Sequence, residues 1–167
     1  MRKQLYVGKG EPTEQNIRVI KNDIEINKPI GGFWTSTFIN EREGSDWVRY
    51  SKNILTRYNS STKAYTLTVS KDARIAQVNS MDDYEELLRK YKLEMADPIL
   101  ASISIFSNLI DFELLSKDYD GFQISQKAVS MAKGSFKYIS LGAYDCESAV
   151  WFRWCFDKVE ELDKRYY

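Results

Sequence analysis

Residues 33–39 read Phe-Trp-Thr-Ser-Thr-Phe-Ile, an aromatic and β-branched run that predicts a strand. Two glycines precede the run and mark the turn from which the strand begins. Because side chains alternate along a strand, the residues divide between two faces. One face carries Phe33, Thr35 and Thr37, and the other carries Trp34, Ser36 and Phe38.

The hydroxyl groups of this strand have two interpretations. In the first, an ordinary two-faced strand satisfies its hydroxyls on neighbouring backbone groups. In the second, the strand faces a ligand, and Ser36 is a polar anchor beside an aromatic platform. The strand by itself leaves both interpretations open.

Further strands are predicted toward both ends of the chain, with helices mainly in the middle. Ser80 is expected to cap one of these helices, because Asp82 and Asp83 follow it in the first turn. The order lacks the regular alternation of a doubly wound sheet, so we expect an α+β fold. The predicted strands are residues 4–8, 64–69, 73–78, 119–124 and 147–156, and the predicted helices are residues 11–21, 80–91, 97–109 and 157–167, with another beginning at residue 46.

The composition limits the chemistry that the chain can perform. There is no histidine, so Ser-His and Cys-His pairs and histidine-ligated metals are excluded, and acid–base work falls to other residue types. With 24 basic and 24 acidic side chains, the formal charge is zero and gives no general attraction to nucleic acid or anionic membrane. The 167 residues, 43% of them hydrophobic, suit one domain with a packed core.

The two cysteines and the apolar runs indicate a cytoplasmic protein. Cys146 and Cys155 are too few for a disulfide framework or a metal site, so we expect reduced thiols and no bound metal. The first ten residues are too short and polar for a signal peptide. No apolar run approaches the roughly 20 residues that span a bilayer, so no membrane partner is expected.

A pair of acidic residues precedes the last predicted strand. Asp145 and Glu147 are separated by one residue, so their carboxylates point the same way if the segment is extended. They are then either a pair that divides acid, base and electrostatic roles, or an ordinary polar turn before a strand. Cys146 between them is not expected to be a nucleophile, because acidic neighbours disfavour the thiolate.

The order of these segments resembles the ADP-ribosyltransferase fold, whose motifs are an N-terminal Arg or His, a Ser-Thr-Ser strand and a Gln/Glu-x-Glu loop. The corresponding segments extend over about residues 4 to 156. More loosely, residues 28–36 together with residues 144–148 resemble bacterial and prophage proteins. They are Leu5-Tyr6-Val7-Gly8, Trp34-Thr35-Ser36-Thr37, Tyr119-Asp120-Gly121-Phe122 and Asp145-Cys146-Glu147.

The resemblance implies one domain over residues 1–167, in which two small, mostly antiparallel sheets flanked by helices form a cleft for NAD. It implies transfer of ADP-ribose from NAD to a protein or nucleic acid, as a toxin or phage effector does. The zero net charge favours a protein as the acceptor. Glu147 would hold the ribose and stabilise its positive charge, Ser36 would support Glu147, and Asp145 would orient the acceptor. The cofactor-binding residues implied are Tyr6, Gly8, Lys9, Trp34, Thr35 and Thr37.

Two positions depart from the family pattern. Val7 stands where the first strand normally supplies Arg or His, and Lys9 is a cation nearby but not in that place. Only the central Ser36-Thr37 pair matches the hydroxyl motif. An inactive nucleotide-binding or protein-interaction module on the same fold therefore stands as the alternative function.

Overall fold

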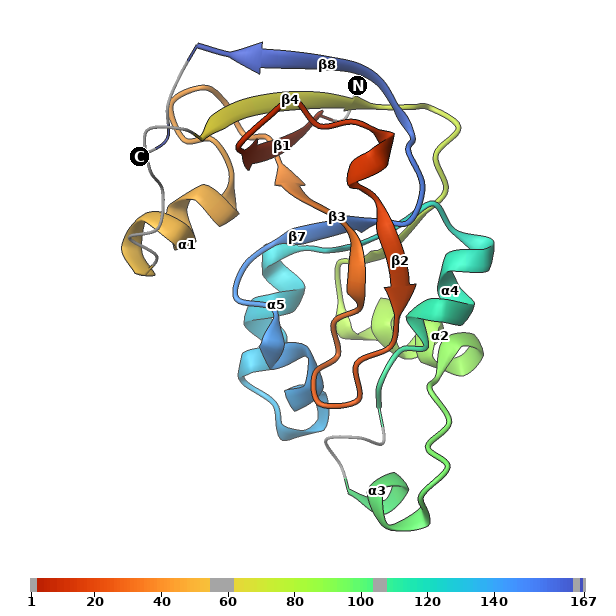
Figure 1. Ribbon diagram of the computed structural model, residues 1–167. Coiled ribbons are helices and arrows are strands. Elements are labelled where there is room, and N and C mark those ends of the chain that lie inside the picture. The colour runs from red at the N-terminus through yellow and green to blue at the C-terminus, as the bar shows by residue number, and fades with distance from the viewer. Residues whose placement is uncertain (1–2, 55–61, 104–107, 164–165, 167) are drawn as a thin grey trace.

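The strand expected at residues 33–39 lies at the centre of the sheet in the computed structural model, which describes residues 3–54, 62–103, 108–163 and 166. This strand, β3 (Ile30–Thr37), pairs through its middle with β7 (Ser148–Trp151). Its end pairs with β1 (Lys3–Gly8), and its beginning pairs with β2 (Arg18–Lys21) (Figure 1). The strand is therefore shared by the two halves of the sheet.

Strand pairing follows one continuous path, β5-β6-β7-β3-β1-β4-β8, with β2 beside β3. Every pair is antiparallel except β5 with β6. The α+β single domain is confirmed, whereas two separate sheets with a cleft between them stay a prediction. The remaining strands are β4 (Lys63–Val69), β5 (Ile75–Val78), β6 (Gly121–Ile124) and β8 (Phe156–Leu162).

Helices cover one face of the β5-β6-β7 half, and a further helix lies beside the β1-β4 half (Figure 1). Apolar side chains of α2, α4 and α5 share the largest core cluster with those strands. The helices are α1 (Asp46–Ile54), α2 (Met81–Tyr91), α3 (Pro98–Ser102), α4 (Phe112–Asp118) and α5 (Gln126–Lys133), and 3-10 turns occur at Glu14–Asn16 and Phe136–Ala143.

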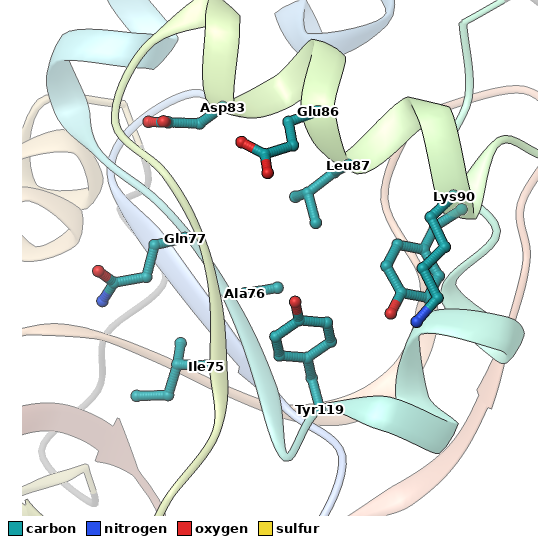
Figure 2. A pocket seen from close by; sticks show the side chains of 9 residues that line it. Ile75, Ala76, Gln77, Asp83, Glu86, Leu87, Lys90 and Tyr119 are labelled. Carbon is teal, nitrogen blue, oxygen red and sulfur yellow. The ribbon is translucent and has the colours of Figure 1, made fainter.

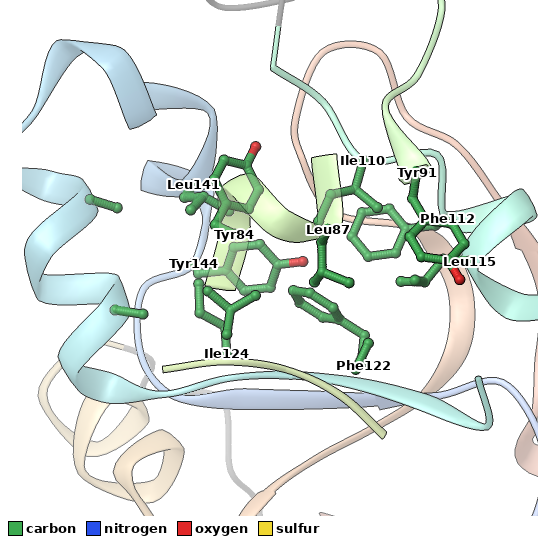
Figure 3. Close-up of a cluster of buried hydrophobic side chains, with 14 of the residues drawn as sticks. Tyr84, Leu87, Tyr91, Ile110, Phe112, Leu115, Phe122, Ile124, Leu141 and Tyr144 are labelled. Atoms are coloured by element: carbon green, nitrogen blue, oxygen red, sulfur yellow. The ribbon is translucent and has the colours of Figure 1, made fainter. Parts of the chain in front are cut away.

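The largest core cluster is aromatic (Figure 3). Phe122 of β6 lies between Phe112 and Tyr144, with ring centroids 5.3 and 6.1 Å away. Val150 of β7 belongs to this cluster, whereas the next residue, Trp151, belongs to a second cluster with Phe33 and other residues. The alternation along β7 therefore buries both faces of the central sheet.

Tyr144 has a fully buried hydroxyl with no hydrogen-bond partner among the residues that the structure describes. An unsatisfied buried hydroxyl costs about 1–3 kcal/mol, so we expect Tyr144→Phe to raise the free energy of unfolding by about 1 kcal/mol. Urea denaturation measures this. Tyr91→Phe is the matched control and should lose stability, because the Tyr91 hydroxyl donates to Asp118 at 2.6 Å. Equal losses in both variants would contradict the prediction.

The helix predicted at residues 80–91 is confirmed, together with its cap. The Ser80 hydroxyl accepts a hydrogen bond from the Asp83 backbone N–H at 3.3 Å, and the Asp83 carboxylate accepts one from the Ser80 N–H at 2.9 Å. The helix predicted from residue 46 is also present, as α1. Both helices could be predicted from the sequence because their capping residues satisfy nearby backbone groups.

Two predicted helices are wrong. Residues 14–16 form a 3-10 turn and residues 18–21 form β2, which contains the β-branched Val19 and Ile20 and pairs with β3 through Arg18 and Lys21. In the helix predicted at residues 157–167, residues 157–162 instead belong to β8, which pairs along nearly its whole length with β4, while residues 164–165 and 167 lie outside the described residues. Its charged residues lie on an edge strand, where charges prevent pairing with other chains.

Further elements differ from the sequence prediction. The strand β3 begins at Ile30, so the two glycines expected in the preceding turn lie within the strand. The strand predicted at 147–156 is divided, because β7 ends at Trp151 and β8 begins at Phe156. The helix predicted at 97–109 is reduced to α3, while residues 104–107 lie outside the described residues. In addition, α4 and α5 were not predicted; Asp111 and Ser125 cap them through hydrogen bonds to Leu114 and Ala128 N–H groups.

Candidate functional site

Glu147 directly precedes β7 and lies against the end of β3. The register of these strands pairs Thr35 with Ala149, which brings Glu147 beside the last residues of β3. The Ser36 hydroxyl donates to Glu147 Oε2 at 2.5 Å, and the Thr37 backbone N–H donates to the same oxygen at 2.9 Å. The Thr37 hydroxyl donates to Oε1 at 2.9 Å. The carboxylate is thus held by both matching residues of the hydroxyl motif.

The carboxylate of Glu147 is almost removed from solvent. The residue is 6% exposed and Ser36 is 2% exposed. A buried charge is tolerated only where hydrogen bonds replace its hydration, and Ser36 and Thr37 supply three of them. The arrangement therefore fixes the Glu147 carboxylate in surroundings of low dielectric constant, where electrostatic interactions are strong.

Gln123 is a further partner that the sequence analysis missed. Its side-chain Nε2 lies 2.8 Å from Glu147 Oε1 and 2.8 Å from Thr37 Oγ1. Gln77 of β5 in turn donates to Gln123 Oε1 at 3.3 Å. The sequence held one signal, a glutamine within the otherwise apolar Gly-Phe-Gln-Ile strand, but its contact with Glu147 depends on the pairing of β6 with β7.

Thr35 lies in the same strand but is engaged away from Glu147. Its hydroxyl donates to Gln4 Oε1 at 2.8 Å and accepts from the indole N–H of Trp151 at 2.8 Å. Gln4 is fully buried and also reaches Thr37 at 3.4 Å. Thr35 therefore connects β1, β3 and β7 through buried polar contacts.

Asp145 has surroundings quite unlike those of Glu147. Its side chain is 49% exposed and lies 3.9 Å from Lys28, while Lys133 donates to its backbone carbonyl at 3.0 Å. Burial lowers the pKa of Lys28, and the charge of Asp145 opposes that shift. Burial, and then Asp145, raise the pKa of Tyr50. Asp145 thus presents an accessible carboxylate among cations, whereas Glu147 is enclosed.

Cys146 lies between these carboxylates and is buried. Burial raises the pKa of its thiol to about 11, and the charges of Glu147 and Asp145 act in the same direction. The thiolate is therefore scarce at neutral pH, which agrees with the expectation that Cys146 is not a nucleophile.

The contacts given for the other residues expected to bind a cofactor are with residues other than Glu147. The Trp34 indole N–H donates to the Gly31 carbonyl at 3.0 Å, and its ring packs against the largest core cluster. Tyr6 packs against Phe33, with ring centroids 5.1 Å apart. Gly8 ends β1 and is half-buried, and Lys9 follows it as an exposed side chain. The structure thus brings Ser36, Thr37 and Glu147 together, with Asp145 two residues away.

Three surface pockets lie away from Glu147. One, of about 380 Å³, lies between β5 and α2 (Figure 2). Gln77 projects from β5 away from Tyr119 and Leu87 in this view. The other two, of about 350 and 490 Å³, lie around Trp154 and around Phe152. None of these three pockets is lined by Ser36, Thr37 or Gln123, which hold the Glu147 carboxylate, although Gln77, which donates to Gln123, lines the first.

Comparison of the chain with known protein families, curated proteins and solved structures finds no significant match. Within the described part of the chain, no group of three or more Cys, Asp or Glu side chains is arranged to hold a metal ion. Over the same residues, no helix has the length and apolar character needed to cross a bilayer.

Asp46, at the start of α1, responds electrostatically to Glu147. Burial, and then the charge of Glu147, raise the pKa of Asp46. The folded protein therefore binds this proton more tightly than the unfolded chain, in which Asp titrates near ~3.9, so this residue's contribution to stability falls as pH rises through that range. We expect the stability of Asp46→Asn relative to the wild type to increase over the same range.

The measurement is urea denaturation of both proteins from about pH 3 to pH 7. Replacing Asp46 also removes its 3.2 Å contact with Arg49, which changes stability at every pH at which the contact forms. The quantity to compare is therefore how the difference in unfolding free energy between Asp46→Asn and the wild type varies with pH. Asp82→Asn, an exposed position in the first turn of α2, is the matched control. A difference for Asp46→Asn that stays constant or decreases with rising pH would contradict the interaction.

Proposed function

We propose that the protein is an NAD-dependent ADP-ribosyltransferase that modifies a macromolecule. The observation that carries the proposal is the hydrogen bond from the Ser36 hydroxyl to Glu147, at 2.5 Å. These two residues are 111 positions apart in the chain, and the resemblance requires them to act together. An interaction protein without such a site has no need to bury a carboxylate against this hydroxyl pair.

The donor set around Glu147 fits the ribose next to nicotinamide. NAD supplies a bond between ribose and a positively charged nicotinamide, and this bond breaks with both electrons leaving on nicotinamide. Positive charge then develops on the ribose, and a fixed carboxylate stabilises it most strongly where water is excluded. Glu147 is such a carboxylate, since Ser36 and Thr37 fix both of its oxygens.

The acceptor is proposed to approach from the side of Asp145. This carboxylate is half-exposed and so can contact an incoming nucleophilic group, unlike the enclosed Glu147. Asp145 would orient the acceptor, and Tyr6, Gly8 and Lys9 at the end of β1 would contact the nicotinamide or the phosphates. The chain's zero net charge favours a protein acceptor over nucleic acid, in keeping with a cytoplasmic toxin or phage effector.

The test is incubation of the purified protein with NAD labelled on the adenylate portion and a cell lysate, in parallel with Glu147→Ala. The proposal expects nicotinamide release and label on macromolecules with the wild type, and neither with Glu147→Ala. Protease and nuclease treatment of the labelled product distinguishes protein from nucleic acid as the acceptor. Label that survives the substitution would remove Glu147 from its proposed role.

One observation favours the alternative, an inactive nucleotide-binding or protein-interaction module on the same fold. The Glu147 oxygens already accept four hydrogen bonds from Ser36, Thr37 and Gln123, so a ribose hydroxyl must replace one of them. The alternative predicts binding of NAD or of a protein, without release of nicotinamide. Calorimetric titration with NAD, run beside the labelling assay, separates the two functions.

A further inference from the structure

The side-chain amide of Gln123 contacts Glu147 and Thr37 through its nitrogen, Nε2. Its NH₂ group has two hydrogens and two acceptors within 2.8 Å, Glu147 Oε1 and Thr37 Oγ1. The Thr37 hydroxyl also donates a hydrogen bond to Glu147 Oε1. Both hydrogens of the Gln123 amide and the hydroxyl hydrogen of Thr37 are thus used in contacts among Gln123, Thr37 and Glu147.

The orientation of this amide is fixed from the opposite side. Gln77 donates to Gln123 Oε1 at 3.3 Å, which leaves the NH₂ group toward Glu147. Rotating the amide by half a turn would direct its oxygen at the carboxylate and replace an attraction by a repulsion. Gln123 is 9% exposed, so water is largely excluded from the contact that would be lost.

We propose that Gln123 is a positioning residue for the transfer reaction: it holds the Glu147 carboxylate in place, and Gln77 sets the direction of the Gln123 amide. This inference rests on the proposed function. Gln123 is placed to act through Glu147, since its described hydrogen bonds go to Glu147, Thr37 and Gln77. Its removal therefore changes the reacting carboxylate more than it changes the binding of NAD.

The first measurement does not depend on activity. The side-chain amide signals of Gln123 are assigned in ¹⁵N-labelled protein by their absence from Gln123→Met. We expect them to exchange slowly with water in the wild type and to change position in Glu147→Gln. In Gln77→Met their exchange should be about fivefold faster, since one hydrogen bond that fixes the amide is lost. Signals that are indifferent to Glu147→Gln would overturn the inference.

The second measurement is the rate of nicotinamide release. We expect Gln123→Met to lower kcat by about tenfold or more, as for loss of a hydrogen bond to a charged group, with KM for NAD within about twofold of the wild type. Gln123→Glu, which keeps the size and adds a like charge, should be slower still. Gln15→Met, at an exposed position, is the matched control and should not change kcat.

The outcomes separate this inference from the proposed function. A wild type without nicotinamide release overturns the transferase, while the amide signals still decide whether Gln123 holds Glu147. An active wild type with an equally active Gln123→Met overturns the inference alone. A rise in KM with unchanged kcat also overturns it, because that result would place Gln123 in NAD binding instead.

Discussion

Glu147→Gln is expected to lower nicotinamide release and label transfer by about a thousandfold while the protein remains folded. The substitution keeps the size of the side chain and removes its charge. Gln has one oxygen to accept hydrogen bonds, whereas Ser36, Thr37 and Gln123 all donate to Glu147, so an NH₂ group must now face a donor. Stability should therefore fall by about 1–3 kcal/mol, a loss that circular dichroism and urea denaturation measure separately from rate.

Two companion variants make the result specific. Glu86→Gln changes an exposed glutamate of α2 in the same way and should leave the rate unchanged. Asp145→Asn should reduce transfer to the acceptor more than release of nicotinamide, because Asp145 is accessible to an incoming group. A Glu147→Gln protein that is folded and retains the wild-type rate would contradict carboxylate catalysis.

The site residues that could be predicted from the sequence are those that belong to short local motifs. Ser36 and Glu147 were singled out by their motifs, and strand pairing places them in contact. Gln123 and Asp46 were not singled out as site residues, because Gln123 contacts Glu147 from β6 and Asp46 interacts with its charge from the start of α1. A glutamine in a strand has no local mark of its partner, since that partner is set by the register between strands.

The fold shows the same division between local and distant causes. The capped helix α2 could be predicted because Ser80 and Asp83 satisfy each other's backbone groups within one turn. The strand β8 could not, because its segment Phe156–Leu162 is rich in charge and its pairing partner, β4, lies about 90 residues earlier in the chain. Tertiary pairing overrode the helical preference of that segment.

Gly31→Ala is expected to destabilise the protein by about 3 kcal/mol, because the new side chain strains the backbone conformation and also clashes with a neighbouring strand. Gly31 has φ +92°, a conformation that side chains other than glycine rarely adopt. A Cβ atom there would also lie 2.0 Å from the backbone carbonyl oxygen of Val19, on the paired strand β2. Backbone cannot yield as a flexible side chain does, so β2 and β3 must separate at this point.

Urea denaturation of Gly31→Ala beside Gly142→Ala tests this cause directly. Gly142 has open space around its Cβ position and no positive φ, so the same substitution there should change stability by less than about 1 kcal/mol. Gly31 is the second residue of β3, and Ser36 and Thr37 are at the other end of this strand. The transfer rate of a folded Gly31→Ala protein therefore also shows how strongly the β2–β3 hairpin affects the site. If the two variants were equally stable, the close approach of β2 to β3 would not be the reason for a glycine at position 31.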